Sequence, residues 1–267
     1  MRILYVGDIM ARPGRQVVRE LIPALRREHQ IDVVIAQAEN VSHGKSMSPT
    51  HMKELKECGI DFFTGGNHTT KRPDLHDLLA NPAQPVISPA NLEEFPKEWG
   101  IKTLQTPKGK LLVASILGQT FPTSLPIKNP LAMLDDICRE HLLEEYAAII
   151  INFHGDFSSE KRVIGYYSDG RVTAVIGDHW HVPTADAMVL PSGTAHITDV
   201  GMCGTLHSSL GVELEMIMQR WRDETTTPNR IAEEPPYQFN AVLIETDEET
   251  HLATSITSIN KVIEEIV

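Results

Sequence analysis

The sequence predicts an α/β fold with a mostly parallel sheet. The first third of the 267-residue chain alternates apolar, strand-like runs with amphipathic, helix-like segments, in the order strand, helix, strand, helix, strand. Short buried strands separated by helices are typical of parallel sheets with crossover connections. Polar, metal-capable side chains also follow several predicted strands, and ligand sites of parallel sheets lie outside the carboxyl ends of their strands.

Boundary signals support the elements of this first third. The predicted strands are residues 2–6, 32–36 and 60–64, and the predicted helices are residues 14–28 and 49–58. Ser48-Pro49 is typical of a helix start, because Ser caps free backbone N–H groups and Pro suits the first helical position. Gly59 is typical of a helix end. Pro23 interrupts the first helical pattern and is expected to kink it.

The same patterns continue through the rest of the chain. The further predicted helices are residues 72–80, 129–141, 159–167 and 210–221. The further predicted strands are residues 101–106, 111–117, 147–153, 171–176, 194–198, 239–245 and 251–256. The first two and the last two of these strands are expected to form hairpins. Because no internal repeat or clear linker interrupts the pattern, we expect residues 1–267 to form a single domain.

Composition narrows the classes of function and partner. The formal net charge is −12, so the surface should repel a long nucleic acid but can still admit a small phosphorylated substrate. The apolar runs are too short to span a bilayer, and the opening residues do not resemble a secretory signal. Three widely spaced cysteines argue against a disulfide framework, so we expect a cytoplasmic location. A homo-oligomer is compatible with the sequence, since the apolar helix at 210–221 suits either internal packing or an interface.

Five predicted strands are followed by side chains that bind metals. These side chains are Asp8, Glu39 and Asn40, Asn67 and His68, His154, and His179 and His181. Singly, each has an ordinary alternative, such as a turn, a helix cap or a buried hydrogen-bonded histidine. His179-X-His181 is a stronger signal, because alternate residues of an extended chain point the same way. The joint placement at strand ends favours one metal site with mixed oxygen and nitrogen ligands.

The motifs resemble those of a known family. Gly7-Asp8, Glu39-Asn40, Gly66-Asn67-His68, His154 and the segment 177–181 look like the motifs of the calcineurin-like metallophosphoesterases. More narrowly, the chain resembles the bacterial YmdB-type phosphodiesterases over almost its whole length. The narrower match includes residues 13–15, 159–161, 182–186 and 193–202.

This resemblance implies a four-layer α/β/β/α sandwich with two metal ions at its strand ends. Carried over by position, Asp8, Asn40 and His181 hold one ion. Asn67, His154 and His179 hold the other, and Glu39 bridges the two. Iron or manganese are the expected metals, with zinc as a further candidate. The implied substrates are small phosphodiesters, in particular 2′,3′-cyclic nucleotides.

The implied mechanism uses the two ions and one free histidine. The ions clamp a phosphate and lower the pKa of a bridging water, whose hydroxide attacks phosphorus in line with the leaving oxygen. His68 is the expected general acid for that oxygen. Asp156, Asp178 and Asp199 are candidates for fixing histidine tautomers. His43, in the loop after Glu39, is a candidate for contact with the substrate.

The chain departs from its relatives around this histidine, which keeps other functions open. Relatives often carry an acid three residues after it, where this chain has Lys71, and Asp178 and Trp180 replace two threonines of the last motif. A phosphomonoesterase or nuclease using the same site is one alternative. A metal- or nucleotide-binding regulatory protein with weakened catalysis is another.

Overall fold

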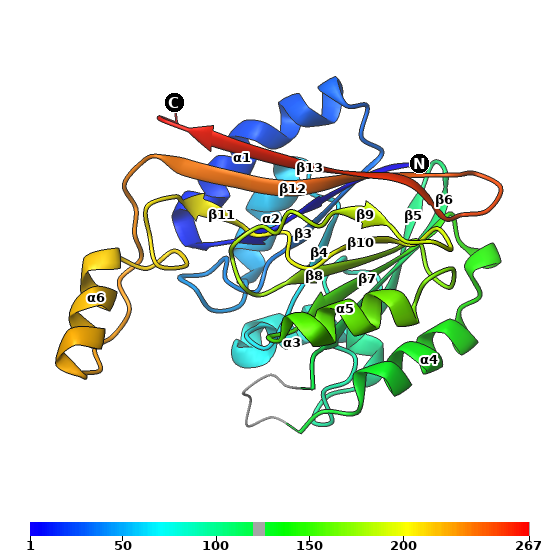
Figure 1. The fold of residues 1–267 in the computed structure, drawn as a ribbon, viewed down its shortest axis with the longest axis horizontal. Helices are drawn as coiled ribbons and strands as arrows, with labels where there is room; N and C mark the ends of the chain where they lie inside the picture. Colours follow the sequence, from blue (N-terminus) through cyan, green and yellow to red (C-terminus); the bar gives the residue numbers. More distant parts are fainter. Residues whose placement is uncertain (120–125, 267) are drawn as a thin grey trace.

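The computed structural model describes residues 1–119 and 126–266, and its strands form two sheets (Figure 1). The strands of the first sheet are β1 (Arg2–Val6), β2 (Asp8–Ile9), β3 (Val33–Gln37), β4 (Phe62–Thr64), β11 (Met202–Thr205), β12 (Tyr237–Thr246) and β13 (Ala253–Ile263). The strands of the second sheet are β5 (Ile101–Thr106), β6 (Gly109–Leu117), β7 (Ala148–His154), β8 (Ala174–Asp178), β9 (Met188–Val189) and β10 (Ala195–Ile197).

Parallel strands form the centre of both sheets, as predicted. In the first sheet, β1, β3 and β4 run parallel, with Ile3 opposite Val33. In the second, β6, β7, β8 and β10 run parallel, and antiparallel β5 and β9 lie at the edges. The predicted C-terminal hairpin, β12 and β13, joins the first sheet because β12 pairs antiparallel with β1. The carboxyl ends of the parallel strands therefore carry the side chains on which the site is built.

Helices cover the outer face of each sheet. The α-helices are α1 (Ala11–Glu28), α2 (Pro49–Glu57), α3 (His76–Ala80), α4 (Pro130–Glu140), α5 (Ser158–Tyr167) and α6 (Leu214–Asp223). Short 3₁₀ turns are η1 (Thr69–Lys71), η2 (Pro73–Leu75), η3 (Lys97–Gly100) and η4 (Leu143–Glu145). Figure 1 shows α1 on one side of the paired sheets and α4 and α5 on the other. This arrangement confirms the four-layer sandwich.

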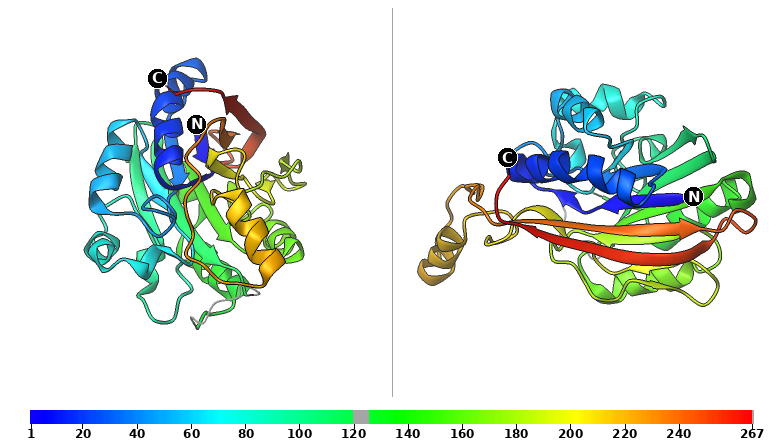
Figure 2. Two further views of the ribbon diagram at one scale, coloured as in Figure 1. Left: turned by 90° about the vertical axis from the view of Figure 1, so that its left-hand side faces the viewer. Right: turned by 90° about the horizontal axis from the view of Figure 1, so that it is seen from above.

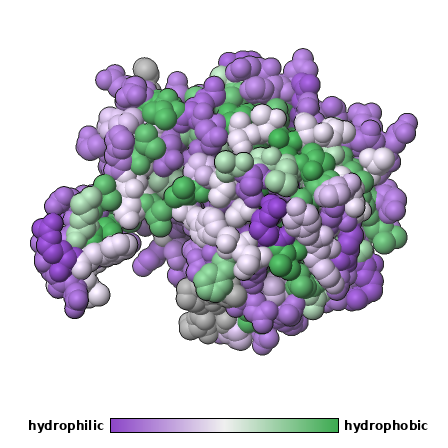
Figure 3. Space-filling model, in the orientation of Figure 1, coloured by the Kyte–Doolittle hydropathy of each residue, from purple (hydrophilic) through white to green (hydrophobic). Residues whose placement is uncertain are grey.

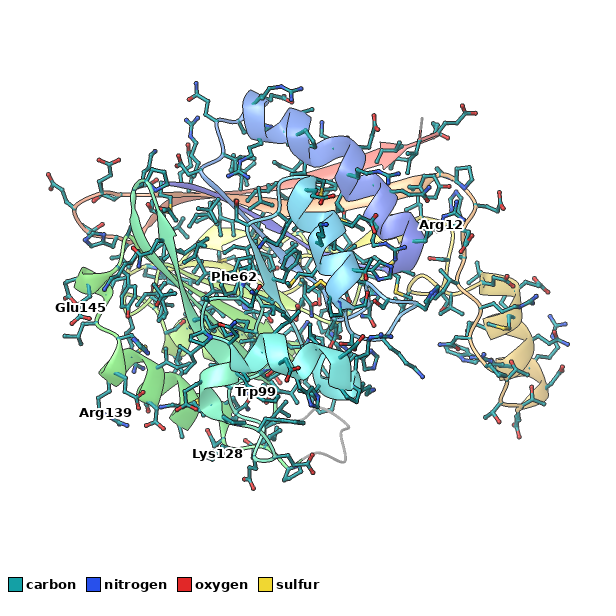
Figure 4. All side chains as sticks on the ribbon, turned by 180° about the vertical axis from the view of Figure 1, so that it is seen from behind. Arg12, Phe62, Trp99, Lys128, Arg139 and Glu145 are labelled. Atoms are coloured by element: carbon teal, nitrogen blue, oxygen red, sulfur yellow. The ribbon has the colours of Figure 1, made fainter. Side chains whose placement is uncertain are left out.

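Three apolar clusters fill the spaces between these four layers. One joins α1 and α2 to the first sheet, with Val18 and Leu55 packed in the same cluster as Val34. Another lies between the sheets and includes Phe62, which Figure 4 labels inside the molecule. A third joins α4 and α5 to the second sheet. Side chains alternate between clusters along β1, which is why its sequence is apolar at every position after Arg2.

The predicted first or last residues of several helices and strands were wrong. Helix α1 begins at Ala11, three residues earlier than predicted, and Pro23 lies inside it without ending it. Helix α6 covers 214–223 instead of 210–221. Strand β8 starts at 174 and β13 continues to 263. The pattern missed β2, β9 and β11, since strands of two to four residues are too short to show a period.

Helix α6 stands away from the layers (Figure 2). The sequence left its packing open between the interior and an interface, and the structure exposes Leu214, Met218 and Trp221, the last by 83%. These apolar side chains are spaced along one side of the helix, and Figure 3 shows green atoms next to purple ones on α6. Among the described residues, no helix is long and apolar enough to cross a membrane.

The layer between the two sheets makes the fold sensitive to truncation of Phe62, which is 1% exposed. We expect Phe62→Ala to lower the free energy of unfolding by about 3–5 kcal/mol, because it removes a buried ring and leaves a cavity. Phe157→Ala is the matched control, since Phe157 is 56% exposed and its loss should cost less than about 0.5 kcal/mol. Urea unfolding followed by circular dichroism measures both. Equal effects would contradict the assignment of Phe62 to the inter-sheet core.

Candidate metal centre

The seven predicted ligands and His68 come together at the carboxyl ends of the strands. They follow or end β1, β3 and β4 of the first sheet and β7 and β8 of the second. Parallel pairing aligns these ends, and the face-to-face packing of the two sheets brings the two sets within contact distance. The side chains fall into two groups.

Asp8, Asn40 and His181 form the first group. The Nε2 atom of His181 lies 2.8 Å from Asp8 Oδ2. The amide of Asn40 donates to the same carboxylate oxygen, and its Nδ2 atom lies 3.4 Å from His181 Nε2. The other imidazole nitrogen, His181 Nδ1, lies 3.2 Å from the Leu210 carbonyl, which orients the ring. These are the three residues expected to share one ion.

Glu39, Asn67, His154 and His179 form the second group. His154 Nε2 lies 3.0 Å from Asn67 Oδ1 and 3.2 Å from Glu39 Oε1. The ring centroids of His154 and His179 are 4.7 Å apart. One ligand atom each from Glu39, His154 and His179 lies within 4.8 Å of the other two. Glu39 also accepts a hydrogen bond from the His68 backbone N–H, at 2.8 Å, which fixes its second oxygen.

Buried charge dominates this second group. Burial raises the pKa of Glu39 to about 7, against the opposing effect of His154. Burial alone would lower the pKa of His154, but the carboxylates of Glu39 and Asp178 outweigh it and raise that pKa to about 9. Burial and the neighbouring His154 lower the pKa of His179 to about 2, which keeps this imidazole neutral. The fully buried carboxylate of Glu39 therefore lies beside two imidazoles, and the imidazole of His179 is neutral.

Asp178 fixes the orientation of His154. Its Oδ1 atom lies 2.8 Å from His154 Nδ1, and its Oδ2 accepts from Asn152 Nδ2 at 2.9 Å. This contact leaves Nε2 of His154 facing Asn67 and Glu39. The geometry is the one expected of an acid that sets a histidine tautomer. Asp156 lies farther from its histidine, with Oδ1 at 3.7 Å from His179 Nε2.

The segment that carries His179 and His181 is a turn, which corrects the extended chain assumed from the sequence. Both residues have positive φ, 108° for His179 and 62° for His181. Residues other than glycine rarely adopt this backbone conformation, which costs on the order of 1–3 kcal/mol per residue. The two imidazoles therefore face the site because a strained turn directs them, and the surrounding contacts must hold that turn.

A buried ion pair holds the turn from beneath. Lys161 of α5 is fully buried, with Nζ 2.6 Å from Asp199 Oδ2 and 2.7 Å from the Asp178 carbonyl. Asp199 Oδ2 also accepts from the Trp180 backbone N–H, at 2.8 Å. The Lys161 ammonium lies 4.1 Å from the centroid of the Trp180 ring. Asp199, predicted to fix a histidine tautomer, thus acts on the backbone between the two histidines.

The sequence prediction assigned no role to Lys161. Its signal is a lysine on the buried side of α5, in line with Ile164 and Gly165. A lysine in such a position must find an acid within the core. The partner, Asp199, is 38 residues away in the sequence, so the pattern alone could not identify it.

Gly66 allows the two sheets to approach at the site. A Cβ atom at this position would lie 2.5 Å from the His154 ring, closer than any real side chain allows. Asn67 itself does not need a left-handed backbone, since it is not among the residues with positive φ. The glycines before Asn67 serve close packing. They let Asn67 Oδ1 reach His154.

His68 lies between the ligand groups and a lysine. Its Nδ1 atom is 2.9 Å from Asn40 Oδ1. Burial and then the positive charge of Lys71 lower the pKa of His68 to about 4. Lys71 therefore places a positive charge beside the histidine that the resemblance makes the general acid. The departure seen in the sequence therefore has a direct electrostatic effect.

The donors fit metal ions. Among the described residues, Asp8 Oδ1 is buried and has no hydrogen-bond partner, although its other oxygen is bound twice. An unsatisfied buried carboxylate oxygen is costly and suits a cation. Mixed carboxylate, amide and imidazole donors suit manganese, iron and zinc. The two groups offer three and four such side chains.

Comparison with known proteins decides the family. The model of the family described as YmdB-like protein matches residues 4–259. The chain belongs to this family. It is 35% identical to the 2′,3′-cyclic-nucleotide 2′-phosphodiesterase of Bacillus subtilis strain 168, over 97% of this chain and 96% of the relative. The family assignment confirms the predicted resemblance.

Two solved structures agree with this family assignment. A protein of Mycoplasma pneumoniae described as a novel phosphatase superposes with a TM-score of 0.91 and 29% identity, covering 99% of this chain and 94% of that one. A hypothetical protein of Thermus thermophilus superposes with a TM-score of 0.89 and 33% identity, covering 98% and 100%. The family and these likenesses confirm the prediction that the chain is a phosphoesterase of the hydrolase class.

The buried pair beneath the turn leads to a stability prediction. We expect Lys161→Met to lower the free energy of unfolding by about 3–5 kcal/mol, because Asp199 is left buried without its cation. Lys97→Met is the control, since the Lys97–Glu140 pair has the same 2.6 Å separation but is partly exposed. Its loss should cost less than about 1 kcal/mol. Chemical unfolding measures both, and similar losses would show that Lys161 does not support the turn.

Proposed function

We propose that this protein is a metal-dependent phosphodiesterase that hydrolyses small phosphodiesters, in particular 2′,3′-cyclic nucleotides. One observation carries the proposal: the donors of Asp8, Asn40 and His181 contact one another, and those of Asn67, His154 and His179 gather beside the buried Glu39. The B. subtilis relative, named for that activity, supports the choice of substrate. Residues 1–267 act as one metallophosphoesterase domain in this proposal.

Each cluster would hold one ion, and Glu39 would reach both. Asn40 would present its Oδ1, the atom that contacts His68 Nδ1. When bound, two ions neutralise charge on the phosphate and supply an activated water at neutral pH. Iron or manganese are the proposed metals, with zinc next, because the donor set mixes oxygen and imidazole ligands.

The protein's own residues orient these donors and supply a proton. Asp178 fixes the tautomer of His154, and Lys161 with Asp199 keeps His179 and His181 aimed inward. His68, which is not needed as a ligand, would protonate the leaving oxygen of the substrate. Free Cys58, Cys138 and Cys203 agree with the proposed cytoplasmic location. The proposed substrate is small, and neither a membrane nor a long nucleic acid takes part; a homo-oligomer is compatible with the proposal.

Two other functions have specific support. The M. pneumoniae protein described as a phosphatase favours a phosphomonoesterase using the same donors, and a nuclease is a further variant of that chemistry. The effect of Lys71 on His68 favours a regulatory metal- or nucleotide-binding protein with weakened catalysis, since a general acid must carry a proton. A panel of p-nitrophenyl phosphate, bis-p-nitrophenyl phosphate, cyclic nucleotides and RNA distinguishes them. Hydrolysis of diesters without cleavage of polymer supports the phosphodiesterase.

Metal content tests the ligand assignment. We expect Asp8→Asn and His179→Ala each to lower the amount of bound metal, because each removes a donor from one cluster. Elemental analysis of the purified proteins measures this directly. His207→Ala is the control, since no contact places His207 in either cluster. Full occupancy in both site variants would remove these residues from the proposed ligand set.

Turnover tests the role of His68. We expect His68→Ala to retain its metal and to lose about 10²-fold or more in kcat on 2′,3′-cyclic AMP, the usual cost of losing a general acid. The measurement pairs steady-state kinetics with elemental analysis of the same sample. Undiminished kcat at unchanged metal content would show that another group protonates the leaving oxygen.

A further inference from the structure

A cavity borders the candidate metal centre. Its volume is about 770 Å³. The lining comes from loop residues 42–45 with Lys71 and Arg72, and from Val212, Pro228, Asn229 and Ile231. The space is large enough for a nucleotide-sized group.

The chain's course places this cavity beside the metal centre. Ser42 and His43 follow Asn40, and Lys71 belongs to the 3₁₀ turn that begins directly after His68. The opposite wall continues from Leu210, whose carbonyl contacts His181. Hydrogen bonds tie the loops to one another, because Ser46 Oγ donates to the Thr69 carbonyl at 2.6 Å. Two segments that follow site residues, and a third that contacts His181 through Leu210, therefore line the cavity.

The cavity is positively charged although the chain is acidic. Its described lining contains two lysines, Lys45 and Lys71, and one arginine, but neither Asp nor Glu. Arg72 is already paired with Asp74, at 2.6 Å. Within the described part of the chain, neither lysine forms an ion pair with an acid. In a protein of net charge −12, two unpaired ammonium groups beside a phosphate site form an attractive site for a further anion.

The rest of the lining suits the organic part of a nucleotide. Met10, Val212, Pro228 and Ile231 add apolar side chains to the lining. His43 also lines the cavity and is exposed, with a left-handed backbone at φ 56°. Pockets that combine apolar walls with a few polar anchors are typical of small-ligand sites.

We propose that this cavity binds a second phosphate of the substrate through Lys45 and Lys71, so that the preferred substrate carries a phosphate in addition to the scissile diester. The inference rests on the proposed function and specifies its substrate class: a nucleoside 2′,3′-cyclic phosphate bearing a further phosphate group on its 5′ side. A 5′-phosphomonoester and the next phosphodiester of a short oligonucleotide present the same anionic oxygens.

The direct test measures binding, separately from turnover. Metal-loaded protein is titrated calorimetrically with adenosine 3′,5′-bisphosphate and with adenosine 3′-monophosphate. We expect the bisphosphate to bind about ten-fold more tightly, since a hydrogen bond to a charged group contributes about 1.5 kcal/mol or more. The double variant Lys45→Gln/Lys71→Gln should lose this preference, and added salt should reduce it in the wild type.

Lys110→Gln is the matched control. Lys110 is exposed near the start of β6, at the opposite end of the parallel strands from His154, and the same change there should leave the preference intact. Equal affinities in the wild type, or a preference that survives in the double variant, would overturn the proposal.

Kinetics separate this inference from the proposed function. Adenosine 2′,3′-cyclic phosphate is compared with its 5′-phosphorylated form and with a dinucleotide ending in a 2′,3′-cyclic phosphate. A lower KM for either phosphorylated substrate, raised about ten-fold by Lys45→Gln, supports the second site and shows which phosphate it takes. No turnover of any diester together with an intact calorimetric preference would refute the phosphodiesterase but keep the anion site. A KM raised equally for all three substrates would refute the selective second site.

Discussion

The structure depends on how it balances acids buried at its strand ends. Asp8, Glu39, Asp178 and Asp199 are each 2% exposed or less, and all lie where apolar strands of the two sheets finish. Removing a carboxylate from water costs several kcal/mol unless a cation or a set of donors compensates. Asp199 has Lys161, and Asp178 has His154 and Asn152. Glu39 has His154 and the His68 backbone, while one oxygen of Asp8 lacks a partner within the described residues. The buried acids beneath the site, Asp178 and Asp199, thus have partners, whereas Asp8 within the site has an oxygen without one. This distribution is expected of a place that binds metal ions.

The buried Lys161–Asp199 pair determines the shape of the metal centre above it. The Lys161–Asp199 pair reaches the turn through the Trp180 backbone and the Asp178 carbonyl, so it acts where two histidines adopt positive φ. The strain of that turn must be offset by contacts around it. A hydrogen-bonded ion pair beneath the turn gives a directional restraint that apolar packing lacks. The two imidazoles can therefore project toward different clusters although only one residue separates them.

Prediction from the sequence succeeded where one segment carried its own signal. The parallel strands, the helix cap at Ser48 and the residues at the strand ends were all visible as local patterns. It failed where the cause lies elsewhere in the chain. Strand β11 exists because Met202 pairs with Asp8, and the turn at His179 exists because Lys161 and Asp199 hold it. The grouping of ligands came from family resemblance, since spacing alone does not say which strand ends face each other across two sheets.

Charge without a partner also occurs in the cavity beside the metal centre, where it is positive. Burial and the positive charge of Lys71 lower the pKa of His68, and Lys71 also lines the neighbouring cavity. A positive charge here is unfavourable for an isolated histidine that must be protonated, but it is favourable for an anionic ligand. The conflict disappears if the ligand brings its own negative charge close to Lys71, because the ammonium is then paired and its effect on His68 is reduced. A substrate with one charge at the scissile group leaves Lys71 uncompensated, whereas a second phosphate compensates it. The proposed second phosphate therefore accounts for a lysine beside a histidine that must be protonated.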